Sequence, residues 1–228
     1  MPGSITLADA PALDDLLTLV ARAARVDDGS VRMIAGGGVL AVYAAVLYPA
    51  GLLDETPTVL GLRTVAIEER EGFDLVAPLA SLRARLERAQ EAAARSNNPD
   101  LHRVTISLPP ASPSVSWAAI SPPRGGWYPI DPMDPSRLET VARAGIAEVA
   151  AALPEGTGEQ LVRKVRAEVW GRPIEGAEHL PAGAAFAALS LGFLGPDPVE
   201  LFETGPWTRL STARGHVLVK RRAWTLSR

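Results

Sequence analysis

A run of small and apolar residues over 181–194 carries no charged side chain. A segment that is apolar on every side is typical of a helix surrounded by other elements. Pro181 suits the first helical turn, and Gly195 followed by Pro196 suits a helix stop. The run is shorter than the roughly 20 apolar residues that a membrane-spanning helix needs. The pattern therefore predicts a buried central helix.

Apolar residues recur with the period of an α-helix in four further stretches. We expect helices over residues 11–25, 79–95, 134–153 and 157–170. In the first of them Leu13, Leu16 and Val20 share one face. Cap signals precede the last two, which begin near Asp134 and Thr157.

Shorter runs of apolar residues, bounded by turn residues, indicate strands. These runs cover residues 31–35, 39–48, 58–68, 73–77, 104–108, 115–120, 208–212 and 216–219. Residues 36–38 are glycines and predict a tight hairpin turn, because glycine accepts positive φ. A phosphate loop would need a G-x-x-x-x-G-K-[ST] pattern, which the glycines lack. Residues 121–135 form a long irregular stretch, where sites are often found.

Strands concentrate in the first part of the chain and helices in the second, without βαβ alternation. This distribution predicts the α+β class: a mostly antiparallel sheet backed by helices in the N-terminal part, and a helix-rich C-terminal part ending in a β-hairpin. We expect a single domain over residues 1–228. A soft boundary near 129–135 would separate a strand-rich lobe (1–131) from a helix-rich lobe (132–228) with the hairpin.

The composition of the chain excludes several kinds of functional site. The chain has no cysteine, which excludes disulfides, thiolate nucleophiles, zinc–thiolate sites and iron–sulfur clusters. Its three histidines, His102, His179 and His216, show no metal-ligand spacing, so we expect no metal and no cofactor. The N-terminus lacks the pattern of a signal peptide, and we expect a cytoplasmic protein with no role in the membrane.

Five tryptophans stand near arginines or glycines, and they supply the candidate ligand site. Such groups could stack a planar ligand and pair with its carboxylate or phosphate. The candidate residues are Arg124, Gly125, Gly126, Trp127, Tyr128, Arg172 and Arg209. The alternative is that the tryptophans fill the core or a subunit interface, with arginine packed on their faces.

The C-terminus is basic: residues 204–228 carry six Lys or Arg and no Asp or Glu. Three helices followed by a hairpin resemble the layout of a winged-helix module, whose wing would contact phosphates. The candidate residues for that contact are Arg214, Lys220, Arg221 and Arg222. However, the third helix lacks side chains that read base edges, and cations also protect strand edges. We therefore expect nucleic acid to be an unlikely partner.

Four segments, residues 48–54, 117–124, 168–174 and 205–210, resemble segments of uncharacterised actinobacterial proteins. That family has no assigned activity, so the resemblance transfers no catalytic residue, substrate or cofactor. It supports one cytoplasmic α+β unit.

Three classes of function remain after these observations. The first is a non-enzymatic binding or protein-interaction protein, self-associating as a homodimer, with a pocket or interface lined by Trp and Arg. The second is an enzyme acting on a small anionic metabolite, although no catalytic motif is identified. The third is a weak nucleic-acid binder that uses the basic C-terminal hairpin.

Overall fold

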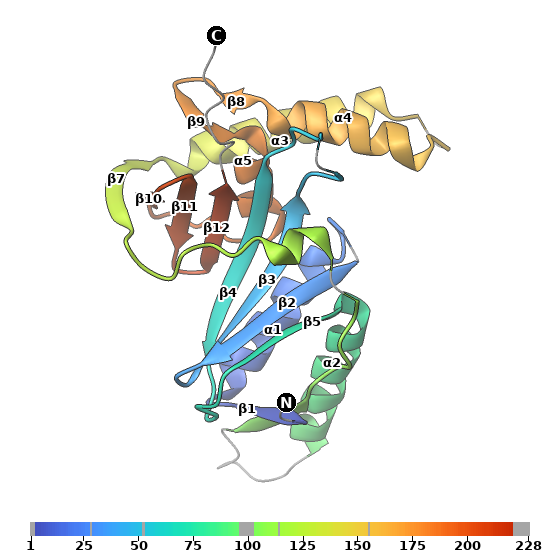
Figure 1. The fold of residues 1–228 in the computed structure, drawn as a ribbon, viewed down its shortest axis with the longest axis vertical. Helices are drawn as coiled ribbons and strands as arrows, with labels where there is room; N and C mark the ends of the chain where they lie inside the picture. Colours follow the sequence, from blue (N-terminus) through green and yellow to red (C-terminus); the bar gives the residue numbers. More distant parts are fainter. Residues whose placement is uncertain are drawn as a thin grey trace. The chain divides into compact units, whose positions relative to one another are not determined.

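The computed structural model describes residues 3–27, 29–51, 53–95, 103–113, 115–154 and 156–220 (Figure 1). The chain forms two compact units. The first is built from Met1–Ala44 and Leu62–Ala119, and the second from Ala45–Gly61 and Ile120–Arg228. The second unit thus takes a segment from the middle of the first half of the chain. Whether the chain folds as a single domain with a boundary near 129–135 stays a prediction.

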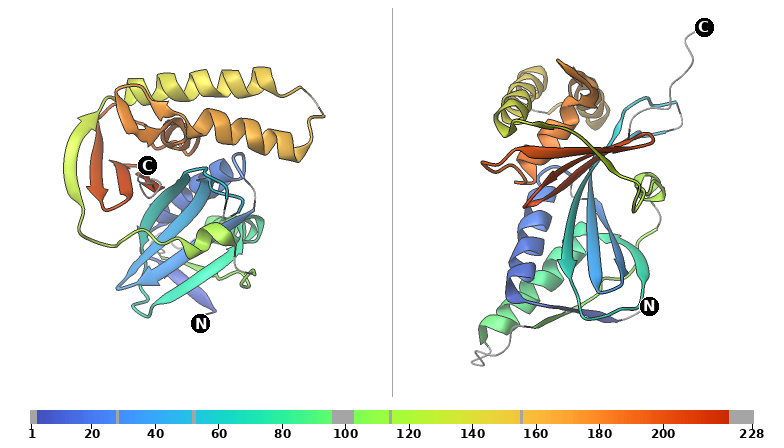
Figure 2. Two further views of the ribbon diagram at one scale, coloured as in Figure 1. Left: turned by 45° about the horizontal axis from the view of Figure 1, so that its top comes forward. Right: turned by 90° about the vertical axis from the view of Figure 1, so that its left-hand side faces the viewer.

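The first unit holds the elements up to the short 3-10 helix η1. They are β1 (Ser4–Leu7), α1 (Ala10–Ala23), β2 (Ser30–Gly36), β3 (Val39–Leu47), β4 (Thr58–Ala66), β5 (Phe73–Pro78), α2 (Leu79–Arg95), β6 (Val104–Ser107) and η1 (Ser116–Ala119). Four strands follow the order β5-β2-β3-β4, and β1 pairs antiparallel with β6 in a separate sheet. Helices α1 and α2 lie on one face of the four strands (Figure 2). The ends of β3 and β4 belong to the second unit.

Helix α1 begins where its sequence supplies a cap. The Asp9 carboxylate accepts a hydrogen bond from Ala12 N at 2.8 Å, which satisfies one of the free N–H groups of the first turn. Leu13, Leu16 and Val20 are buried, as their helical spacing predicts. The helix therefore packs one apolar face against the sheet and α2.

The hairpin of β2 and β3 confirms the prediction for residues 36–38. Gly36 pairs with Val39, so the loop contains only Gly37 and Gly38. Their φ angles are +64° and +88°. Two consecutive positive φ angles define a type I′ turn, whose twist matches that of the strands it joins.

The second unit contains nine elements of its own. They are β7 (Tyr128–Met133), α3 (Pro135–Ala152), α4 (Glu159–Gly171), β8 (Pro173–Ile174), β9 (Ala177–Pro181), α5 (Ala182–Ser190), β10 (Val199–Thr204), β11 (Trp207–Thr212) and β12 (Gly215–Lys220). Its strands continue the order β4-β12-β11-β10-β7, while β8 and β9 form a separate pair.

Helix α5 confirms the predicted buried helix, although it ends at Ser190. Its small residues make room for neighbours: a Cβ on Gly183 would lie 3.0 Å from the Trp170 carbonyl oxygen and 3.2 Å from Leu47 Cδ2. Phe186, from the same helix, stacks on Trp170 with ring centroids 4.2 Å apart. The three helices of the second unit therefore meet around one buried indole.

The predicted architecture is wrong for the C-terminal part of the chain. That part is not a helix-rich lobe ending in a hairpin, because six strands, β7 to β12, alternate with its three helices. Eight of the twelve strands in the described ranges form one large sheet, and β7, β10, β11 and β12 belong to it. Strand β7 was predicted as a loop because it contains Pro129 and Pro132. It is the edge strand of the sheet, and edge strands tolerate proline.

A second local error concerns residues 115–120, which we predicted as a strand. They contain the 3-10 helix η1 instead, with Trp117 and Ala118 buried. Arg32 Nη1 donates to the Ala118 carbonyl at 2.6 Å and holds this turn against β2. A long-range contact of this kind leaves no periodic signal in a short segment.

Candidate functional site

Strands β10 and β11 bring an arginine and an aromatic ring together. They pair antiparallel, with Phe202 opposite Arg209. Side chains alternate between the two faces of a strand. Their neighbours Leu201 and Leu210 are 2 % and 1 % exposed, so Phe202 and Arg209 point to the other, less covered face. Pro129 of β7 lies opposite Phe202 and extends this surface.

The segment before β7 folds over that face. Trp127 Nε1 donates a hydrogen bond to the Pro123 carbonyl at 3.1 Å. Gly126 adopts a φ of +77°, the left-handed region that favours glycine. A Cβ on Gly126 would lie 3.5 Å from Thr204 Oγ1, which shows how close the turn comes to β10. This turn carries the Trp127 indole to the strand surface.

Two aromatic rings lie close to the Arg209 guanidinium. Its Cζ lies 4.7 Å from the Trp127 ring centroid and 4.5 Å from that of Phe202. Both distances are within the range of cation–π contacts. We call Trp127, Arg209 and Phe202 the arginine stack. The N–H groups of a guanidinium lie in its plane, so aromatic rings near its faces do not prevent these groups from donating hydrogen bonds.

The arginine in this stack is electrostatically unusual. Among the described residues, Arg209 has no hydrogen-bond acceptor and no ion-pair partner, and its Nε is buried without an acceptor. Burial lowers the pKa of the Arg209 guanidinium below its ordinary value, since desolvation disfavours the charged form. The group still carries its charge, because arginine does not deprotonate in proteins.

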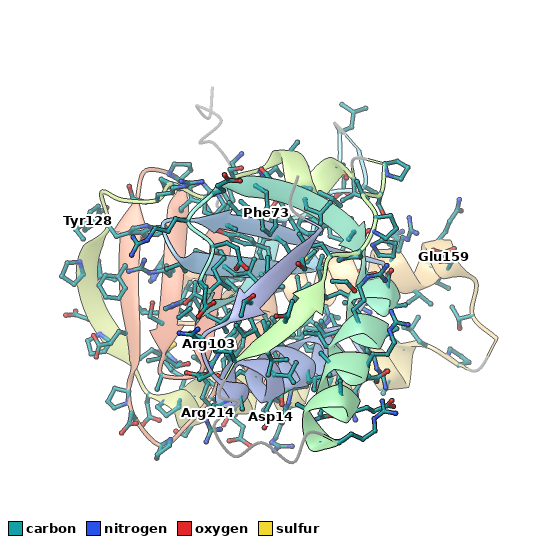
Figure 3. All side chains as sticks on the ribbon, turned by 90° about the horizontal axis from the view of Figure 1, so that it is seen from below. Asp14, Phe73, Arg103, Tyr128, Glu159 and Arg214 are labelled. Carbon is teal, nitrogen blue, oxygen red and sulfur yellow. The ribbon has the colours of Figure 1, made fainter. Side chains whose placement is uncertain are left out.

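The structure brings together part of the predicted ligand site. Trp127 and Arg209 stack, with Gly126 at the turn, while the flanking Arg124 and Gly125 are exposed. Tyr128 is exposed at the start of β7 (Figure 3), and its hydroxyl lies 3.3 Å from Glu203 Oε2. That these residues bind a ligand stays a prediction.

Two features of this site did not follow from the sequence. Phe202 was missed: the alternation of Val199 and Leu201 is a sequence signal for a strand, but the position of Phe202 opposite Arg209 depends on the strand register. Arg172 does not join the stack. It lies at the end of α4, where it pairs with Glu148 at 2.7 Å and with Glu168 at 3.4 Å.

As far as the structure describes it, up to Lys220, the basic C-terminal hairpin does not form a free wing. Strand β12 lies between β4 and β11, so the hairpin is an interior part of the sheet. Arg214, in the turn before β12 and well away from Tyr128 (Figure 3), donates to the Leu194 carbonyl at 2.9 Å. Lys220 ends β12, while Arg221 and Arg222 lie outside the described residues.

A second charged surface lies in the first unit, on α2. Leu79, Leu82, Leu86 and Ala89 bury one side of this helix. The rest of the helix carries four arginines against two glutamates: Arg83, Arg85, Arg88, Arg95, Glu87 and Glu91. Arg83 and Arg95 form ion pairs one helical turn away, at 2.7 Å and 3.6 Å. Arg88 is exposed, with no side-chain partner in the described part of the chain.

The described residues hold neither a candidate metal cluster nor a candidate membrane span. They contain no group of three or more His, Asp or Glu side chains placed to hold a metal ion. None of the helices described is long and apolar enough to cross a membrane.

Two family models match the chain, one for each half. Residues 1–102 match a domain of unknown function (DUF8010), and residues 122–224 match another (DUF8185). No curated protein matches the chain by sequence. These matches confirm the predicted resemblance to proteins with no assigned activity. An actinobacterial source stays a prediction.

Solved structures give a clearer likeness. The beta subunit of DNA polymerase III from Caulobacter crescentus matches with a TM-score of 0.50 and 14 % identity, over 95 % of this chain and 64 % of that chain. The chain has a sliding-clamp fold. The beta subunits of Thermotoga maritima (9 % identity, TM-score 0.46, 98 % and 66 % covered) and Pseudomonas aeruginosa (14 %, 0.43, 98 % and 66 %) also match. The chain thus spans about two thirds of the length of these clamp subunits.

The clamp fold corrects three expectations. The α+β architecture with a helix-rich C-terminal part is wrong. The interpretation as a ligand-binding or self-associating protein of unknown role is wrong as the leading function, because the fold is that of a DNA polymerase clamp. The expectation that nucleic acid is an unlikely partner is wrong for the same reason.

Proposed function

We propose that the chain acts in the cytoplasm as a clamp-like protein on duplex DNA. The observation that supports this is the likeness to the Caulobacter beta subunit, which extends over 95 % of the chain. A related protein from Caulobacter crescentus is described as a DNA polymerase sliding clamp. A protein of this kind would act by holding DNA and partner proteins, without bond-making chemistry of its own.

Helix α2 is the surface that we propose meets DNA. Contacts between arginine and phosphate are independent of base sequence, which suits a protein that moves along a duplex. Exposed ion pairs between residues one turn apart contribute only about 0.3–0.5 kcal/mol. Arg83 and Arg95 can therefore exchange their glutamates for phosphates at little cost, and Arg88 has no ion pair with any residue that the structure describes.

The test is binding of a fluorescent random-sequence duplex, followed by anisotropy from 50 to 200 mM salt. We expect an affinity that falls steeply with salt, because phosphate contacts release counterions. The double variant Arg83→Gln/Arg88→Gln should bind more weakly and reduce the log–log salt slope by about 2, roughly one unit for each lost contact.

The matched control is Arg163→Gln on α4. Arg163 forms the same kind of exposed one-turn pair, with Glu159 at 2.5 Å, but belongs to the second unit. It should leave the affinity and the slope unchanged. Absence of binding at 50 mM salt would contradict the proposed function, whereas an equal loss in both variants would move the contact away from α2.

A further inference from the structure

Within the described residues, the cation of the arginine stack has no counterion. Arginine in a partly buried site normally meets a carboxylate, a phosphate or backbone carbonyls, since an unpaired buried charge is costly. The rings of Trp127 and Phe202 compensate in part through cation–π attraction. They do not satisfy Nε, which has no acceptor in the described residues.

The geometry of the stack selects a planar oxyanion. With two rings close to its Cζ, the guanidinium offers a partner its N–H groups, which lie in its own plane and form a rigid fork. A carboxylate matches that fork with two parallel hydrogen bonds. Stacking also fixes the side chain in advance, so little rotamer entropy is lost when the partner arrives.

The surroundings disfavour a polyanion such as DNA. Strands β7, β10 and β11 together carry three carboxylates, Asp131, Glu200 and Glu203, against the single cation Arg209. Glu200 lies two residues from Phe202 and is exposed on the same face. A duplex places several phosphates along any contact, so these carboxylates would repel it. One isolated carboxylate with positive or neutral neighbours would not meet that repulsion.

We propose that the arginine stack is a docking site for one acidic side chain of a partner protein, in a segment whose flanking residues are basic or neutral. Gly125 and Gly126 carry no side chain on the covering turn and let a peptide backbone approach Trp127. The basic flanks of the segment meet Glu200 and Asp131. This site is separate from α2 and does not depend on the proposed action on DNA.

The test follows the Arg209 Nε–Hε signal by NMR in full-length protein labelled with ¹⁵N-arginine. The probe is the blocked peptide Ac-Lys-Ala-Glu-Ala-Lys-NH₂, with the same peptide carrying Gln in place of Glu as its matched partner. The Glu peptide should shift the signal saturably, and the Gln peptide should bind at least about tenfold more weakly, because charge-assisted pairs are roughly twice as strong as neutral ones. This comparison uses only the unmodified protein.

Two variants locate the effect and assign the signal. Arg209→Lys assigns the signal, because the variant lacks it. The variant keeps the charge but loses the planar fork, so the preference for the Glu over the Gln peptide, measured for it and for the unmodified protein by isothermal titration calorimetry, should disappear. Arg163→Gln removes an exposed arginine of α4, outside the stack and its covering turn, and should leave the binding unchanged.

Three results would overturn the proposal. They are no shift with either peptide up to several millimolar, an equal response to Glu and Gln, and a larger shift with a 12-base-pair duplex at the same salt. The last would assign the stack to a DNA phosphate. None of them bears on α2, so they leave the proposed function standing.

Discussion

Trp170 shows how single glycines decide the packing of the second unit. The indole is 2 % exposed and lies where α3, α4 and α5 meet. A Cβ on Gly145 of α3 would overlap its six-membered ring. Glycine in the middle of a helix costs about 1 kcal/mol relative to alanine. That cost is offset here, because only glycine lets α3 approach the indole.

We predict that Gly145→Ala destabilises the protein in spite of its better helix propensity. Overpacking of a core costs about 1–3 kcal/mol, which exceeds the propensity gain, so the free energy of unfolding should fall by about 1–2 kcal/mol. Urea unfolding followed by Trp fluorescence measures this. The control is Gly171→Ala, where a Cβ would lie 3.7 Å from Pro57 Cδ and change stability little. An increase in stability for Gly145→Ala would contradict the packing argument.

Between elements, one arginine ties three segments of the first unit together. Arg32 of β2 donates to both carboxylate oxygens of Asp74 on β5, at 2.8 Å and 2.6 Å, and to the carbonyl of Ala118 in η1. The hydrogen bonds with Asp74 raise the pKa of the Arg32 guanidinium, which outweighs the effect of burial. The side chain therefore fixes the segment that follows β6.

Arg32→Gln should release η1 before it disturbs the sheet. A hydrogen bond to a charged group contributes about 1.5–3 kcal/mol, so we expect a loss of that order in the free energy of unfolding. Hydrogen exchange should accelerate at Ala118, whose N–H bonds the Val115 carbonyl at 3.0 Å, more than at Val31 or Met33 of β2. Arg83→Gln, which breaks an exposed pair on α2, is the control and should change little. Uniform acceleration across the first unit would argue against a local anchor.

The helices and strands show what could and could not be predicted from the sequence. Helices α1, α2 and α5 and the β2–β3 hairpin follow from local periodicity and caps, which act within a few residues. Strands β1 and β7 to β10 were missed. Among them, β7 contains two prolines, and β10 follows a Pro-Asp-Pro turn and carries two glutamates. Such strands are defined by their partners rather than by their own residues.

The candidate site divides in a similar way. Trp127 and Arg209 could be named from the sequence, because aromatic and guanidinium groups are unusual beside glycines and in a strand. Their contact could not, since it joins positions 82 residues apart and needs the register that sets Phe202 against Arg209. Arg172 has an equal sequence signal, but α4 gives it Glu148 and Glu168 as partners.

At the scale of the whole molecule, the second unit is discontinuous in sequence. It includes Ala45–Gly61. In the sequence this segment comes before β5, α2 and β6, which belong to the first unit. From this segment Leu47 packs near Gly183, and Gly61 lies against Leu191. The family models, which match residues 1–102 and 122–224, do not reflect this sharing.

We predict that the two halves of the chain behave differently when separated. A fragment of residues 1–119 contains every segment of the first unit and should give a dispersed ¹H–¹⁵N spectrum. A fragment of residues 120–228 lacks Ala45–Gly61, so β12 loses β4 as its neighbour and the apolar surface of Leu191 is uncovered. It should be poorly dispersed or aggregate. A well-folded 120–228 fragment would show that the shared segment is dispensable.

The shared segment also sets an order of events on the ribosome. Domains generally fold as units during synthesis, N-terminal first. The first unit can fold once residue 119 has left the ribosome. At that point Ala45–Gly61 has been made, whereas the other segment of the second unit, roughly a hundred residues, has not. When the second unit folds, β4 is already formed, and β12 pairs with an existing strand edge. The slow search for a partner distant in the sequence is thereby shortened. The order of synthesis thus makes the first unit the surface on which the second unit folds.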